Sequence, residues 1–190
     1  MRYYNPNITR DDLYERLHQL DDEIDAYIES ENLNIDSIEI VIAGSSALVL
    51  NNVNINKTED IDVIKTSNYI SEKLLEKYDM NTRVSGLENF FPYNYIDRIK
   101  QLKINTFVVK YYILSLEDDV IAKISANRGK DLEHLRNQEL ISQINWEVLK
   151  NCALEMKDSL FNDEQYKWFV VRYNDFVEVN GHEEAIIENV

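Results

Sequence analysis

The stretch AGSSALVLNNVNINKTEDIDVI, residues 43–64, decides how we interpret the fold. A strand-like apolar run at residues 38–42 comes directly before it, and the run ends at Gly44 and Ser45. Asp60 lies sixteen residues after Gly44, and Asp62 follows within a second short apolar run. Because side chains two positions apart on a strand leave the same face, the two carboxylates are predicted to share one face of a sheet.

This pattern suggests chemistry on phosphates. Two neighbouring carboxylates repel each other unless a cation lies between them, and Mg²⁺ accepts such an oxygen pair while keeping sites open for phosphate oxygens. Gly44 permits close backbone approach, and Ser45 opens a short helix whose free N–H groups can receive a phosphate. Alternatively, Asp-x-Asp is a solvated strand face and Gly-Ser a plain turn. Ile61 and Val63 are apolar, however, which gives the strand a buried side.

Composition narrows the class of protein. The chain has 190 residues, of which 44% are hydrophobic, which fits one domain or one domain with a helical appendage. Its single cysteine, Cys152, excludes an internal disulfide and is expected to be a small buried apolar residue. No apolar run approaches the length of a membrane span, so we expect a soluble cytoplasmic protein with no membrane partner.

The charge is uneven along the chain. The net charge of −15 by itself argues against nucleic acid as a partner. Residues 98–136 nevertheless carry eight basic against five acidic side chains. This stretch is either an anion site or an ordinary solvated surface.

Periodicity gives the order of the elements. Helices are predicted at 9–31, 45–51, 68–78, 115–127, around Leu132 and Leu135, at 145–159 and at 163–177; strands are predicted at 37–43, 60–65 and 104–114. Residues 80–100 are expected to be irregular and the last dozen residues to form a loose acidic tail. Trp146 and Trp168 are expected in the core, and the histidines at the surface.

This order predicts an α/β (α+β) fold, a small mixed sheet with flanking helices followed by C-terminal helices. We assign residues 1–136 to a domain built around the sheet, with an N-terminal helix, and residues 137–190 to a helical extension packed on it.

Gly-Ser after a strand, followed by Asp-x-Asp in the next strand, resembles the nucleotidyltransferase superfamily related to DNA polymerase β, and its minimal bacterial branch in particular. A second segment, LSLEDDVIAKISANRGKDLEHL at residues 114–135, is similar to the downstream motif of AbiEii-type toxin nucleotidyltransferases and of related small, uncharacterised nucleotidyltransferase-like proteins. The residues that match this motif are Lys123, Arg128, Lys130 and Asp131. The resemblance covers about residues 37–136.

The resemblance implies a Mg²⁺-dependent transfer of a nucleoside monophosphate from an NTP to tRNA or to a protein hydroxyl. Asp60 and Asp62 would hold the metal, and Gly44, Ser45, Lys123, Arg128 and Lys130 would bind the nucleotide. Asp131 would help to organise the catalytic site. The resemblance further implies a toxin of a toxin–antitoxin or phage-defence pair, with a cognate antitoxin as partner. Without the resemblance, Lys123 could simply extend to solvent and Asp131 could be a helix-start carboxylate.

Two departures from the family pattern leave a second hypothesis open. The Gly-Ser to Asp-x-Asp gap is slightly long, which suggests an enlarged loop at residues 51–57. The strand predicted at 104–114 lacks the third carboxylate of polymerase-type members, so either Asp131 or one of residues 117–119 replaces it or catalysis is lost. A fold that has lost chemistry would serve as a binding or adaptor protein. If catalysis is retained, the bases between Arg98 and Arg136 should converge on the carboxylates, with Lys123 nearest.

Overall fold

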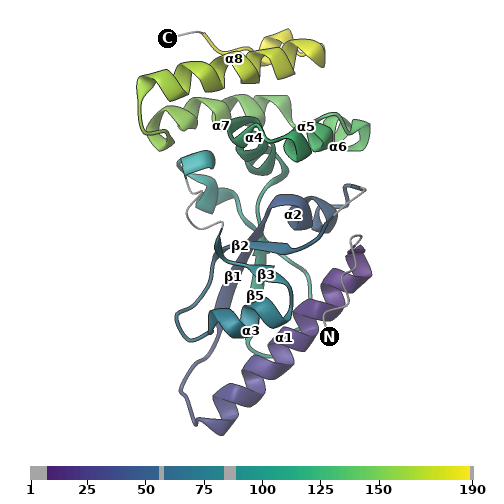
Figure 1. Ribbon diagram of the computed structural model, residues 1–190, viewed down its shortest axis with the longest axis vertical. Coiled ribbons are helices and arrows are strands. Elements are labelled where there is room, and N and C mark those ends of the chain that lie inside the picture. Colours follow the sequence, from purple (N-terminus) through teal and green to yellow (C-terminus); the bar gives the residue numbers. More distant parts are fainter. Residues whose placement is uncertain (1–7, 56–57, 84–88, 189–190) are drawn as a thin grey trace. The chain divides into compact units, whose positions relative to one another are not determined.

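The computed structural model describes residues 8–55, 58–83 and 89–188 and is shown in Figure 1. It consists of two compact units. Unit 1 comprises Met1–Ser85 and Ile99–Ile113, and unit 2 comprises Gly86–Arg98 and Leu114–Val190. The predicted ranges were 1–136 and 137–190, whereas the structure groups residues 86–98 and 114–136 with the C-terminal helices. These compact units do not test domain boundaries, so the domain boundary at residue 136 stays a prediction.

Unit 1 is built on a mixed five-stranded sheet with strand order β3-β2-β1-β5-β4. The strands are β1 (Ile38–Ala43), β2 (Ile61–Lys65), β3 (Met80–Asn81), β4 (Lys100–Gln101) and β5 (Val109–Ile113). The central strand β1 runs antiparallel to β2 and parallel to β5. Parallel neighbours need a long crossover connection, and β1 and β5 are indeed far apart in the chain. The predicted α/β fold is therefore confirmed.

One face of the sheet carries the core of unit 1. The long helix α1 (Arg10–Ser30) begins at Thr9, whose hydroxyl and backbone exchange hydrogen bonds with Asp12. Its apolar stripe and alternate residues of β1, β2 and β5 form one buried cluster. The buried Asp21 accepts hydrogen bonds from the backbone N–H groups of residues 107, 108 and 109, which fixes the start of β5 against α1. Two shorter helices, α2 (Gly44–Leu50) and α3 (Glu72–Lys77), complete the unit.

Unit 2 is helical. Its helices are α4 (Leu116–Ala126), α5 (Gly129–Leu135), α6 (Gln138–Gln143), α7 (Trp146–Ser159) and α8 (Asp163–Val179), with 3₁₀ helices η2 (Tyr95–Arg98) and η3 (Glu183–Ala185). Ser115, Asn137, Asn145 and Asn162 each accept a hydrogen bond at a helix start. The consecutive helices α7 and α8 lie side by side (Figure 1). Cys152 on α7 is fully buried, as predicted.

Several predicted elements are wrong in detail. The helix predicted at 68–78 begins only at Glu72, because Ser71 caps it, and the strand predicted at 104–114 is confined to Val109–Ile113. Helix α6 was not predicted, and the region 80–100 contains β3 and η2. The tail is not loose over residues 183–188, because Tyr173 and Asn174 hydrogen-bond the backbone of Ala185 and Ile187.

Two predicted side-chain environments are also wrong. Trp168 is 62% exposed, so it is not a core residue, and His134 is buried rather than at the surface. In the part of the chain that the structure describes, every helix is too short or too polar to cross a lipid bilayer.

Candidate functional site

Three neighbouring strands bring the first motif together at one edge of unit 1. The register pairs Ala43 of β1 with Asp62 of β2, and Asp62 in turn with Asn81 of β3. Because β1 and β2 are antiparallel, the end of β1 meets the beginning of β2. Ile61 and Val63 belong to the core cluster, so Asp62 points to the opposite face of the sheet. The prediction that this strand has a buried side and a separate carboxylate face is confirmed.

Gly44 is required by two separate features of this corner. Its φ angle is +68°, in the left-handed region that glycine adopts without strain. A Cβ atom at this position would lie 2.3 Å from Oδ2 of Asp62, closer than any real contact. The glycine therefore lets the backbone turn from β1 into α2 directly against the carboxylate. The close approach that Gly44 permits in this structure is that of Asp62, and binding of a phosphate at Gly44 stays a prediction.

Asn81 joins the two carboxylates and was missed at the sequence level. Its side-chain nitrogen donates to Oδ2 of Asp60 at 3.2 Å and to Oδ1 of Asp62 at 3.4 Å. A two-residue strand gives no periodic pattern, so the sequence offered no signal beyond an Asn that follows a helix. Asn81 lies beside Asp62 on the neighbouring strand and places an uncharged amide next to the carboxylate.

Asp60 is fixed through its backbone. The Ser46 hydroxyl donates to the carbonyl oxygen of Asp60 at 2.7 Å, which ties the first turn of α2 to the residue before β2. Ser45, the predicted phosphate-binding residue, is buried at the same helix start. Both Asp60 and Asp62 are partly exposed, so their oxygens remain accessible.

The donor set fits a hard divalent cation. The carboxylate oxygens of Asp60 and Asp62 are the ligands that Mg²⁺ takes, whereas the amide oxygen of Asn81 accepts a hydrogen bond from the backbone N–H of Arg83 at 3.1 Å. No cluster of three or more His, Cys, Asp or Glu side chains with metal-binding geometry occurs in the described parts of the chain. Two carboxylates alone suit Mg²⁺, which is usually held by one or two carboxylates plus substrate phosphates and water.

The second predicted motif forms a charged cluster within unit 2, in which Lys123 and Asp131 are buried and Arg128 is exposed. The Lys123 ammonium is 4% exposed and lies 3.6 Å from Oδ1 of Asp131, and the Arg128 guanidinium lies 2.6 Å from Oδ2 of the same carboxylate. Two cations thus share one buried anion, which leaves the cluster electropositive. Lys123 does not extend to solvent. That Lys123 faces the carboxylates of Asp60 and Asp62 stays a prediction.

His134 is buried beside this cluster, and its pKa is lowered chiefly by burial. Burial, followed by the charges of Lys123 and Lys130, lowers its pKa to about 4 from an ordinary value of 6.5, although Asp131 opposes this shift. Its Nδ1 is buried and has no hydrogen-bond partner among the described residues. His134 therefore stays neutral at physiological pH. Lys130 itself is exposed.

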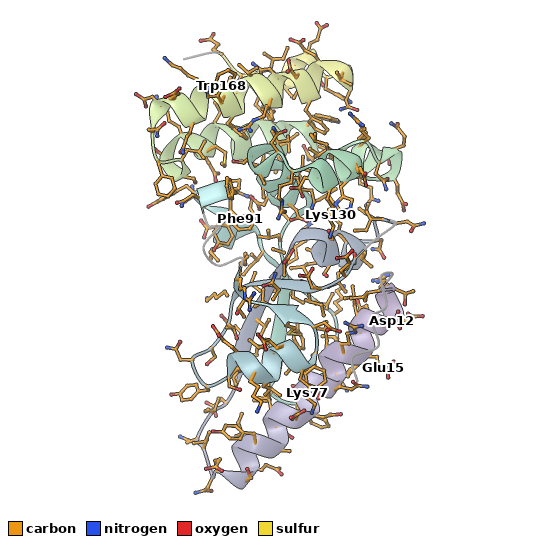
Figure 2. The ribbon with its side chains drawn as sticks, viewed as in Figure 1. Asp12, Glu15, Lys77, Phe91, Lys130 and Trp168 are labelled. Carbon is orange, nitrogen blue, oxygen red and sulfur yellow. The ribbon has the colours of Figure 1, made fainter. Side chains whose placement is uncertain are left out.

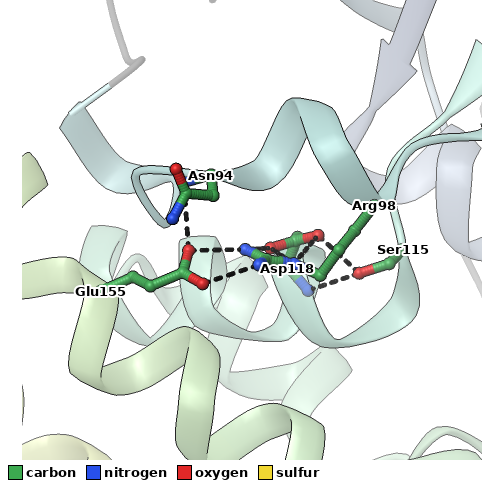
Figure 3. A network of polar contacts seen from close by, with 5 residues as sticks. All are labelled: Asn94, Arg98, Ser115, Asp118 and Glu155. Carbon is green, nitrogen blue, oxygen red and sulfur yellow. Dashed lines mark hydrogen bonds and ion pairs between the residues drawn. The ribbon is translucent and has the colours of Figure 1, made fainter.

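Arg98 is the centre of a network of ion pairs within unit 2. Its guanidinium donates to Asp118 at 2.7 Å and to Glu155 at 2.7 and 2.8 Å (Figure 3). Burial opposes the charged form, but the two carboxylates more than offset it and raise the pKa of Arg98. Ser115 also donates to the fully buried Asp118. Arg98 is thus committed to a structural network within unit 2, and the convergence of the bases between Arg98 and Arg136 on the Asp60–Asp62 site stays a prediction.

The acidic start of α4 is also largely structural. Asp118 belongs to the Arg98 network, and Glu117 accepts a hydrogen bond at 2.9 Å from the backbone N–H of Asn145, just before α7. Asp119 is buried as well, with 1% of its surface exposed. Asp118 and Glu117 are therefore both held by hydrogen bonds within unit 2.

Comparison with known proteins gives a match to a protein family. A family model described as a nucleotidyltransferase of unknown function (DUF6036) matches residues 15–180, which include both motifs and Asn81. No curated protein and no solved structure matches the chain at a significant level of similarity. Since the family model covers most of the chain, this protein belongs to the DUF6036 family of nucleotidyltransferases of unknown function.

Proposed function

We propose that this protein transfers a nucleoside monophosphate from an NTP to a hydroxyl acceptor on tRNA or on a protein. The observation that carries the proposal is the corner at which Gly44 packs against Asp62 while Asn81 holds Asp62 and Asp60 together. The arrangement keeps the carboxylates of Asp60 and Asp62 within reach of one amide group. Adjacent carboxylates without a cation are unfavourable, so their close placement favours metal binding.

The chemistry follows from this donor set. The acceptor hydroxyl would lose its proton to water and its oxygen would bond to the α-phosphorus, while the bond from that phosphorus to the bridging oxygen would break and pyrophosphate would leave. Mg²⁺ on Asp60 and Asp62 would offset the charge that develops on the phosphate oxygens. Gly44 and Ser45 would place backbone N–H groups near the triphosphate. The role of Lys123, Arg128 and Lys130 on its phosphates stays a prediction, which the electropositive cluster around Asp131 supports.

Label transfer tests the proposal directly. The protein is incubated with Mg²⁺ and each α-³²P-labelled NTP in the presence of total tRNA or cell lysate. We expect label on one acceptor class and loss of at least 100-fold in rate in Asp62→Asn, since removing one charge-stabilising group typically costs about 10²–10³-fold. Glu59→Gln removes the same charge from an exposed neighbour of Asp60 and should transfer label normally.

Two results would contradict the proposal. One is the absence of transfer from all four NTPs to tRNA and to lysate protein. The other is equal transfer by wild type, Asp62→Asn and Glu59→Gln, which would place the activity elsewhere.

The toxin role is a further part of the proposal and is supported by the second motif alone. We expect expression of the wild type, but not of Asp62→Asn, to arrest bacterial growth, and co-expression of an antitoxin to relieve the arrest. Growth unaffected by the wild type would remove the toxin role and leave the transfer reaction in place.

A binding or adaptor protein is the second candidate function, and Asn81 favours it. An amide where a third carboxylate could stand leaves two charged ligands, which is fewer than polymerase-type members carry. Under this alternative, calorimetry shows Mg²⁺-dependent NTP binding that Asp62→Asn abolishes, while no label reaches an acceptor.

A further inference from the structure

A cavity within unit 2 is lined by none of the residues assigned a role in either motif, although Ser125 lies within the second motif segment. Its volume is about 530 Å³, which is in the size range of small-molecule sites. It lies between the segment before η2, the end of α4 and the first turns of α8, and it is lined by Asn89, Phe90, Ser125, Leu160, Phe161, Gln165, Trp168 and Arg172. None of these described lining residues is acidic, in a protein whose net charge is −15.

Two large aromatic side chains at this cavity face solvent. Phe161 is 75% exposed, and Trp168, labelled on α8 in Figure 2, is 62% exposed. Exposed aromatic side chains that gather around a hollow are costly in water and mark a binding surface. The half-buried Phe90 supplies a third ring. The walls of the cavity therefore suit a flat apolar body.

Arg172 gives the cavity a charge. Its Nε is buried and has no hydrogen-bond partner among the described residues. Burial lowers the pKa of Arg172, and no opposing effect of a carboxylate accompanies it. A guanidinium is planar and prefers two parallel hydrogen bonds to a carboxylate. Arg98 in the same unit pairs with two carboxylates, those of Asp118 and Glu155. No such ion pair is found for Arg172 among the described residues.

The rim of the cavity is held in place before any ligand arrives. The Gln165 side-chain oxygen accepts from the backbone N–H of Phe161 at 3.2 Å, which fixes the turn between α7 and α8. The segment that carries Phe90 is anchored through Asn94, whose backbone N–H donates to Glu155 at 3.0 Å, and through Arg98. A preformed site costs little ordering entropy on binding.

We propose that this cavity binds a carboxylate with a flat apolar body, either a free aromatic acid or the C-terminal residue of a peptide. Trp168, Phe161 and Phe90 contact the apolar part, and Arg172 pairs with the carboxylate. One guanidinium among the described lining residues suits a single negative charge better than a phosphate chain. The overall negative charge of the protein also disfavours a polyanion.

The experiment uses the full-length protein and ¹H–¹⁵N NMR of the two tryptophan indole N–H groups. Trp168 lines the cavity, whereas Trp146 stacks on Phe176 and His182 and serves as an internal control. Titrated probes are 2-naphthoate, the neutral 2-naphthamide, a tripeptide that ends in Phe as free acid or amide, and AMP. We expect a carboxylate probe to shift Trp168 but not Trp146, and to bind at least 10-fold more tightly than its amide.

Two variants test whether binding depends on the charge of Arg172 in particular or on any positive charge on α8. Arg172→Gln should reduce binding of the acid to the level of the amide. Lys167→Gln removes a positive charge from an exposed neighbour of Trp168 that does not line the cavity, and it should leave binding unchanged. Binding of the free acid points to a small-molecule ligand, and binding of the peptide acid alone points to a chain end. Each of these two outcomes supports the proposal.

Three outcomes would overturn it: no probe shifts Trp168, acid and amide bind equally, or AMP binds more tightly than either acid. Acid binding that survives Arg172→Gln would also exclude the pairing. None of these measurements depends on nucleotidyl transfer, so the two proposals fail separately.

Discussion

At the scale of single residues, the geometry of the candidate site in unit 1 depends on Gly44, Asp62 and Asn81, each for a different physical reason. Gly44 is a glycine because its backbone is left-handed and because the Asp62 carboxylate occupies the space of its side chain. Asp62 is placed by its register beside Ala43. Asn81 is placed by a strand of only two residues, and its amide reaches both carboxylates. Each residue depends on the positions of the other two.

Asn81 lends itself to a charge test. Asn81→Asp places a third carboxylate beside two others, so we expect it to lower the Tm in EDTA and to restore it with Mg²⁺ by more than in the wild type. Asn81→Ala removes two hydrogen bonds to charged groups and should cost about 1–3 kcal/mol with no gain in Mg²⁺ response. Thermal unfolding at matched ionic strength checks both expectations.

The matched control is Asn34→Asp, which adds the same charge at an exposed position between α1 and β1. A Mg²⁺ response of Asn81→Asp no larger than that of Asn34→Asp would count against metal binding at Asp60 and Asp62.

At the scale of elements, Arg98 links three parts of unit 2. It lies at the end of η2 and pairs with Asp118 on α4 and Glu155 on α7, while Ser115 at the start of α4 donates to the same Asp118. Figure 3 shows the guanidinium between the two carboxylates. A segment without regular periodicity is thereby fixed to two helices, and the aromatic residues before η2 gain a defined position.

Removing the guanidinium should destabilise unit 2 strongly. Arg98→Met leaves a fully buried carboxylate without its cation, and breaking such a pair costs about 3–5 kcal/mol. Arg98→Lys keeps the charge but loses the bidentate geometry, so it should recover part of the loss. Urea denaturation measures both variants.

Arg136→Met provides the comparison, because Arg136 is an exposed cation at the end of α5 and its removal should change the free energy of unfolding by less than about 0.5 kcal/mol. Equal stability of Arg98→Met and Arg136→Met would mean that the network contributes nothing.

At the scale of the whole molecule, a buried neutral histidine couples stability to pH. The pKa of His134 is about 4 when folded and about 6.5 when unfolded. Between these values the unfolded chain binds a proton that the folded chain does not, so stability is present above pH 6.5 and is lost as the pH falls toward 4. The positive neighbours Lys123 and Lys130 contribute to this difference.

We therefore expect the wild type to lose about 2 kcal/mol of unfolding free energy between pH 7 and pH 5 through His134 alone. His134→Gln should lack this loss, because glutamine does not titrate. Urea denaturation at both pH values measures the unfolding free energy of the wild type and of His134→Gln. Because both proteins have the same carboxylates, the contribution of the carboxylates cancels in the difference between them.

His18→Gln, which replaces an exposed histidine on α1, should behave as the wild type. A pH dependence that is the same in wild type and His134→Gln would show that His134 is not held neutral in solution.

The sequence by itself determined the long elements and the first motif. The apolar stripe of α1, the run of β1 and the spacing of Asp60 and Asp62 are local patterns, because helix and strand periodicities repeat within a few residues. They were sufficient for the α/β fold and for a carboxylate face opposite the core. Lys123 and Asp131 were both singled out by a local motif, although neither their pairing nor their burial was predicted.

Only the tertiary structure decided the roles that depend on residues far apart in the chain. Asn81 lies beside Asp62 through a two-residue strand, which is too short to show a period. Arg98 lies among bases in the sequence but is paired with Asp118 and Glu155 in space. Trp168 follows the helical period of core residues and is nevertheless exposed, because periodicity shows that residues share a face but not whether another element covers it.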